Sequence, residues 1–197
     1  MKSRSMGRGS LAITLSAMLV VSGCPKNWIN IAIADIPVVL QIVTSVLSIV
    51  AIAQGKGQAD PNMVAEVQTI AAQAKADLTT AQNLINDYQK ASAADKPGIL
   101  GKIDAALSTA QKDLEGILTT FHVKDTATQT AVAAGIGVAL TTVAAIYSLL
   151  PPPPPSTTMP TASHAPRSAP HKPRTPAELK ADYNALVSSQ FPDAVIH

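Results

Sequence analysis

Two stretches of the chain repeat apolar residues at alternating spacings of three and four, the period of a helix face that packs on another helix. In residues 61–92 these positions are Val64, Val67, Ala71, Ala74, Leu78, Ala81, Ile85 and Tyr88, and in residues 96–121 they are Ile99, Ile103, Ala106, Ala110, Leu114, Ile117 and Phe121. The charged residues of both stretches fall outside these stripes. The pattern predicts two helices, at 61–92 and 96–121, that each bury one face.

Two other segments are apolar on nearly every side. Residues 36–53 contain no charged residue, and residues 126–150 form a run of 25 uncharged residues. The longer run suffices to cross ~30 Å of hydrocarbon, and the shorter one only just does. We expect helices at 35–53 and 125–150 to bury against the two striped helices, with insertion into a bilayer as the alternative. Small residues spaced by four, at Ala131, Gly135 and Ala139, would let another helix approach closely.

Short connections between successive helices favour antiparallel neighbours. The sequence therefore predicts an all-α fold, an antiparallel up-down-up-down four-helix bundle over residues 35–150. Three aspartates that shortly precede a proline, Asp35, Asp60 and Asp95, are typical helix starts. Before the first of them, residues 29–33 alternate like a strand, and a helix kinked at Pro37 is the other interpretation.

The chain after residue 150 changes composition. Residues 151–174 are rich in proline, serine and threonine, which predicts a disordered, extended linker. Residues 175–191 begin with the capping box Thr175-Pro176-Ala177-Glu178, and Leu179, Tyr183 and Leu186 predict a short amphipathic helix. A helix of that length is marginal alone, so we expect it to dock on its own bundle or on a partner.

The N-terminus has the order of a secretory signal: three basic residues, an apolar stretch at 11–21 and then small residues. It ends in Val21-Ser22-Gly23-Cys24, which contains the chain's single cysteine. These residues resemble the lipobox of bacterial lipoproteins. The resemblance implies cleavage between Gly23 and Cys24, a signal peptide at 1–23, acylation of Cys24 and a tether at 24–34 before the bundle. It further implies a place in the bacterial cell envelope. In a two-membrane host, Pro25 in place of an aspartate implies the periplasmic side of the outer membrane.

Charge and composition restrict the classes of molecule that the protein is expected to bind. The chain has 15 basic and 13 acidic residues, and loss of residues 1–23 would remove Lys2, Arg4 and Arg8, leaving a net charge near −1. No basic patch of the kind that binds nucleic acid is visible. Aromatic residues make up 3% of the chain, which leaves few rings to stack on bases or sugars. We therefore expect a membrane contact through lipid, together with a protein partner or self-association, and neither nucleic acid nor a small-molecule substrate.

The sequence contains few residues in patterns typical of a catalytic or metal-binding site. His122, His164, His171 and His197 lack the spacing of metal ligands, although the two in the linker could bind a metal loosely. Asp35 is interpreted as a helix cap, with an intramembrane carboxylate as the alternative. Trp28 suits either an interfacial anchor or packing under the bundle. We predict no catalytic, cofactor-binding or metal-binding residue and no enzyme activity.

The function expected from these features is that of a lipid-anchored envelope protein with a structural or protein-interaction role. Its bundle would be held at the membrane surface, and its proline-rich arm would extend to a partner. The alternative is a membrane-inserting protein, a pore or an envelope assembly component, that uses helices 36–53 and 126–150.

Overall fold

The computed structural model describes residues 27–152 and 174–197, which contain helices and no strand. The all-α prediction is therefore confirmed for this part of the chain. The helices are α1 (Asn27–Gly55), α2 (Pro61–Lys90), α3 (Lys96–Thr120), α4 (Thr126–Leu149) and α5 (Pro176–Val187), followed by a short 3-10 helix, η1 (Pro192–Ala194). The signal peptide, its cleavage site at Gly23 and Cys24, and most of the linker lie outside the described residues.

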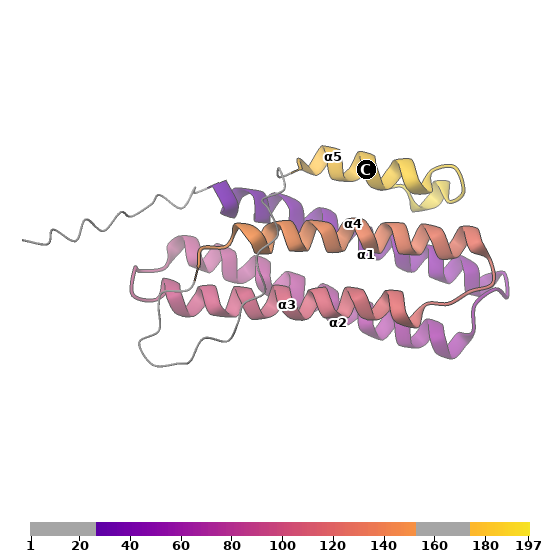
Figure 1. The fold of residues 1–197 in the computed structure, drawn as a ribbon, viewed down its shortest axis with the longest axis horizontal. Helices are drawn as coiled ribbons and strands as arrows, with labels where there is room; N and C mark the ends of the chain where they lie inside the picture. The colour runs from indigo at the N-terminus through magenta and orange to yellow at the C-terminus, as the bar shows by residue number, and fades with distance from the viewer. Residues whose placement is uncertain (1–26, 153–173) are drawn as a thin grey trace, which may run out of the picture.

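Four long helices lie side by side and enclose one apolar core (Figure 1). α1 packs on α2 and α4, and α3 packs on the same two helices. Helix ends meet through specific contacts. Trp28 in the first turn of α1 meets the ring of Tyr88 near the end of α2 edge-on at 5.5 Å between centroids. After α3, the backbone N–H of His122 donates to Sδ of Met63 near the start of α2 at 3.2 Å.

Most of the residues that the spacing of α2 and α3 predicts to be buried are buried. Tyr88 and Ile99 are only half-buried, and Leu100 and Leu107 are buried beside the predicted stripe of α3. In α2 the buried side chains are Val64, Val67, Ala71, Ala74, Leu78, Ala81 and Ile85. In α3 they are Leu100, Ile103, Ala106, Leu107, Ala110, Leu114 and Ile117. Among the described helices, α2 and α3 make the most extensive contact. The three-four period thus identified the faces that form the core.

The start of α1 differs from the prediction. The helix begins at Asn27, so Asp35 lies in its interior and is no cap, and Pro37 stands inside the helix. The strand interpretation of residues 29–33 is wrong, and residues 27–34 of the expected tether belong to α1. The cause is tertiary packing. Trp28 and Ala32 are buried on the same side as Ile36 and extend the apolar face upstream. This burial offsets the roughly 3 kcal/mol cost of a proline in a helix interior.

The other two aspartate–proline starts differ in how they cap. The carboxylate of Asp60 accepts the backbone N–H groups of Asn62 at 2.8 Å and Met63 at 3.3 Å. Asp95 stands at the start of α3, but its side chain makes no capping hydrogen bond and instead accepts the hydroxyl of Ser92 at 2.6 Å. Both helices begin where the sequence predicts, yet only Asp60 satisfies free backbone donors of its helix.

These two aspartates form a matched pair for mutation. Asp60→Ala is expected to lower the free energy of unfolding by about 1 kcal/mol, because two amide groups lose their acceptor. Asp95→Ala should cost clearly less, because only a side-chain bond to an exposed serine is lost. Urea titration followed by circular dichroism measures both. An equal or larger loss for Asp95→Ala would contradict the assigned capping.

The C-terminal helix docks on its own bundle. α5 contacts α4 and α1, η1 contacts α1, and Figure 1 shows them along one side of the four long helices. The predicted capping box is present, with the Glu178 carboxylate accepting the Thr175 N–H at 2.7 Å and the Thr175 hydroxyl oxygen accepting the Glu178 N–H at 3.2 Å.

The prediction of the buried face of α5 is wrong for one residue. Leu186 is 47% exposed, whereas Val187 is buried together with Leu179 and Tyr183. The buried positions are thus spaced by four and four. Because η1 and the last residues fold back under the helix, the buried stripe rotates away from Leu186.

Candidate interaction site

Tyr183 connects the C-terminal segment, residues 175–197, to the bundle. Its side chain is fully buried, and its hydroxyl donates to Oγ of Ser45 on α1 at 2.7 Å. Ser45 is itself buried and donates to the backbone oxygen of Ala194 in η1. One serine of α1 therefore holds both helical parts of the segment. Burial raises the pKa of the Tyr183 phenol, with the bond to Ser45 acting in the opposite direction.

The space for the Tyr183 ring depends on Gly135 of α4, which has no side chain. A Cβ atom added to Gly135 would lie 2.7 Å from Cγ2 of Val46 on α1 and 3.0 Å from Cε2 of Tyr183. Three helices meet at this point, and only glycine leaves room for all of them. The small-residue spacing in α4 predicted close approach of another helix, and the structure shows that α1 and α5 both use it.

The end of the C-terminal segment is held by bonds of its own. The Asn184 side chain donates to the Ile196 backbone oxygen and accepts the Ile196 N–H, both at 2.9 Å. Lys180 donates to the His197 backbone oxygen at 2.6 Å. Phe191, Ala194 and Ile196 are buried as a result. The segment thus docks as one folded unit in which the tail fixes the helix.

Asp35 is the one charged residue of α1. It is 4% exposed, and its Oδ1 atom makes no hydrogen bond. Burial alone raises the pKa of its carboxyl to about 6. The signal in the sequence was an acid close to a long apolar run, but the cap interpretation placed it at a helix end. The structure instead shows this carboxyl buried in the interior of α1.

A second carboxyl group with a buried oxygen atom, on α3, has no signal in the sequence pattern. Asp113 on α3 has a buried Oδ2 atom without a hydrogen-bond partner. Burial and, secondarily, the charge of Asp77 on α2 raise the pKa of Asp113. Asp113 and Asp77 are not part of the apolar stripes of α3 and α2, so the three-four spacing alone predicts that both side chains are exposed to water. Only the packing of α2 against α3 brings these two acids together.

The histidines form no centre in the part of the chain that the structure describes. His122 is exposed, with its Nδ1 3.2 Å from the Thr120 backbone oxygen, and His197 lies at the chain end. His164 and His171 lie outside the described residues. Among those residues, no group of three or more histidine, cysteine, aspartate or glutamate side chains could hold a metal ion. Trp28 is buried against Tyr88, which agrees with packing under the bundle.

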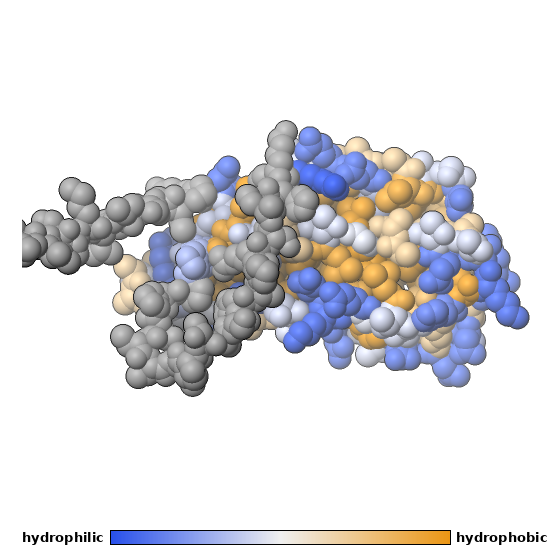
Figure 2. Space-filling view, in the orientation of Figure 1, coloured by the Kyte–Doolittle hydropathy of each residue, from blue (hydrophilic) through white to orange (hydrophobic). Residues whose placement is uncertain are grey.

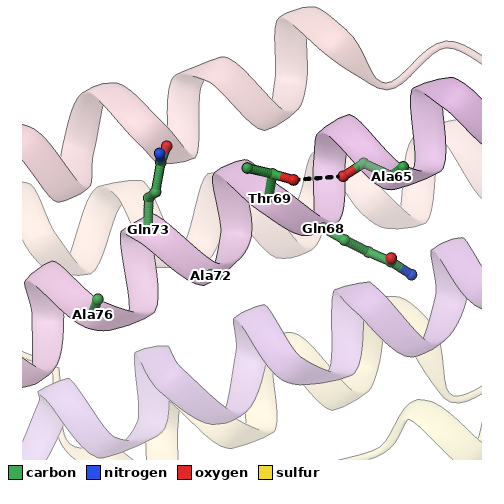
Figure 3. Close-up of a pocket in the computed structure, with 6 residues that line it drawn as sticks. All are labelled: Ala65, Gln68, Thr69, Ala72, Gln73 and Ala76. Carbon is green, nitrogen blue, oxygen red and sulfur yellow. Dashed lines mark hydrogen bonds between the residues drawn. The ribbon is translucent and has the colours of Figure 1, made fainter.

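A shallow depression lies on the outer side of α2. Figure 3 shows its lining, Ala65, Gln68, Thr69, Ala72, Gln73 and Ala76, all from this one helix. Gln68 and Gln73 point to opposite sides, and the Thr69 hydroxyl is bonded to the Ala65 backbone oxygen at 2.9 Å. Polar groups therefore do not converge on a common point, as they would in a binding site for a small molecule.

Two helices, α1 and α4, are long and apolar enough to cross a membrane by length and composition. Within the most apolar 18 residues of each, 56% are buried in α1 but only 39% in α4. Figure 2 shows apolar residues gathered in the middle of the visible face, where Figure 1 places α4 and α3 next to each other. No protein-family model, curated protein or solved structure matches the chain. The inference of function therefore depends on the sequence and structural features described above.

Proposed function

We propose that this protein is a non-enzymatic, lipid-anchored helical bundle of a bacterial cell envelope with a structural or protein-interaction role. The observation that carries the proposal is the N-terminal sequence that ends in Val21-Ser22-Gly23-Cys24, with the single cysteine at the position that cleavage after Gly23 would leave first. Two or three acyl chains on Cys24 would anchor the chain stably, at about 0.8 kcal/mol per buried methylene group.

The start of α1 supports a close attachment to the membrane. Cys24 precedes Asn27 by three positions, which allows at most ~11 Å between the anchor and the helix. We propose that the helices run up-down-up-down. The contact of Trp28 with Tyr88 supports this, because it joins the start of α1 to the end of α2. In this arrangement α4 ends at the anchored end of the bundle.

The proline-rich arm is the proposed route to a partner. Fully extended, the 24 residues at 151–174 reach at most ~75 Å. Because the C-terminal segment docks on its own bundle, a partner would bind the docked segment or replace it. The docked segment offers Leu186 as an exposed apolar contact. Pull-down with the full chain and with a chain ending at residue 150 tests this role, and identical partner sets would remove the arm from the proposal.

Cys24→Ala is expected to move the protein from the membrane to the soluble envelope fraction. The variant is exported behind a cleavable leader without a lipobox, so that no uncleaved apolar leader holds it. Wild-type protein should stay with the membrane through an alkaline carbonate wash, and mass spectrometry should find the acyl groups on Cys24. A free thiol, or a mature start at another residue, would contradict the proposal.

The alternative function is membrane insertion by α1 and α4, and the length and apolar composition of both helices favour it. In that case Cys24→Ala would stay in carbonate-washed membranes, because insertion would not need the lipid. In the structure, however, the C-terminal segment covers part of α1 around Ser45, and 56% of the most apolar 18 residues of α1 are buried. We therefore propose the anchored bundle first.

A further inference from the structure

The outer side of α4 is an uncharged surface that the rest of the described chain leaves open. Ala133, Thr141 and Ala144 are exposed, and Gly137 and Leu140 are half-buried. Their spacing places these five residues, here called the α4 open face, on one side of the helix. A Cβ atom added to Gly137 would meet no described atom within 4 Å, so the helix surface is open at this residue.

This surface differs from the exposed sides of α2, α3 and α5, which carry charged residues. α2 and α3 carry charges along their length, as expected of helices in contact with water. α5 covers part of α1 and α4 and adds exposed charges of its own at Glu178 and Asp182. α4 has no charged residue in 24 positions. An uncharged surface on an apolar helix that is only 39% buried over its most apolar 18 residues can serve as a contact site for a membrane or a protein.

The position of the anchor selects the membrane as the occupant. Cys24 lies three positions before α1, and α1 packs directly on α4. Acyl chains on Cys24 would hold the bilayer within ~11 Å of the first residue of α1. A tether this short leaves the bundle able to lie with one of its sides on the lipid, and contact through α4 desolvates no charge of that helix.

We propose that the α4 open face rests on the surface of the bilayer that holds the acyl chains of Cys24, so that the bundle lies on its side. This inference rests on the proposed lipid anchor. The opposite face of α4, with Val132, Ile136 and Val143, stays buried in the bundle. α4 therefore lies in the headgroup region and does not cross the membrane.

The test compares two exposed alanines in helix interiors, Ala144 in the open face and Ala72 on the outer side of α2. Each is replaced by cysteine in the lipidated protein, whose own Cys24 thiol is blocked by acylation, and is labelled with an environment-sensitive fluorophore. The protein is reconstituted into phosphatidylethanolamine–phosphatidylglycerol vesicles whose acyl chains carry bromine near the headgroup or near the chain end. Circular dichroism checks that both variants keep the helical content of the wild type.

We expect headgroup-proximal bromine to quench the label at residue 144 at least about two-fold more than the label at residue 72. Equal quenching at both positions would overturn the inference. Stronger quenching by chain-end bromine at residue 144 would also overturn it, because the helix would then be inserted. Shielding of residue 144 from aqueous iodide without quenching by lipid would assign the face to another protein molecule instead. Mass spectrometry of the same sample separates the two proposals, since an acylated but unquenched protein contradicts this one alone.

Discussion

Tyr183→Ala is expected to release the C-terminal segment while the four long helices stay folded. Removal of a fully buried aromatic side chain costs about 3–5 kcal/mol, and here the loss falls on the docking of one segment. Ser45 loses the bond from the phenol as well. Because 1.4 kcal/mol is a factor of ten, the undocked population should rise by roughly a hundredfold or more.

Limited trypsin digestion measures this release. Lys180 lies in α5 and donates to the His197 backbone oxygen in the docked state, so cleavage after it reports undocking. Tyr183→Phe should raise the cleavage rate only modestly, since it removes one hydrogen bond worth about 1 kcal/mol and keeps the ring. Leu186→Ala is the matched control on the same helix, and it should change little because Leu186 is exposed. Unchanged cleavage in Tyr183→Ala would show that this residue does not hold the segment.

Asp35→Asn is expected to make the protein more stable at pH 8 and to remove much of its loss of stability with rising pH. The pKa of this carboxyl is 3.8 in an unperturbed setting and about 6 in the folded protein. Below about pH 4 both the folded and the unfolded state hold the proton, and the favourable contribution is fully present. As the pH rises through 6, the folded state must bury a charge, and this contribution is lost.

The size of the pH-dependent loss of stability follows from the shift in the pKa of Asp35. At about 1.4 kcal/mol for each unit of pKa, the wild type should lose up to about 3 kcal/mol between pH 4 and pH 8. The asparagine keeps the shape of the aspartate without its charge, although its amide still needs a hydrogen-bond partner. Urea titrations at pH 4, 6 and 8, taken as the difference between variant and wild type, isolate this residue from the other acids. A difference that does not grow with pH would contradict the buried, unpaired carboxylate.

Asp113→Asn is the comparison for that series. Its carboxyl also has a raised pKa, so the direction of its pH dependence is the same. Asp113 is only half-buried, however, and water screens its charge. A smaller gain at pH 8 is therefore expected for Asp113→Asn than for Asp35→Asn.

The candidate interaction site was only partly accessible from the sequence. The stripe of Leu179 and Tyr183 indicated that the last helix would dock, and Gly135 indicated a place of close approach on α4. Nothing in the spacing connects Tyr183 with Ser45, which lies 138 positions earlier. That pair forms because docking excludes water from both hydroxyl groups, and each must then find a partner.

Periodicity by itself predicted α2, α3 and most of their buried residues, because apolar residues that repeat every three and four positions form one face that can be buried against another helix. The uncharged apolar runs predicted α4 and the greater part of α1. Local signals likewise fixed the caps at Asp60 and Thr175, where a side chain meets its own backbone. Tertiary packing decided the rest. It carried α1 past Asp35 and Pro37, buried the carboxyl of Asp35, turned Leu186 outward and brought the C-terminal segment onto Ser45. Each of these outcomes is a balance between local preference and burial against residues distant in the chain, and local preference is the smaller term.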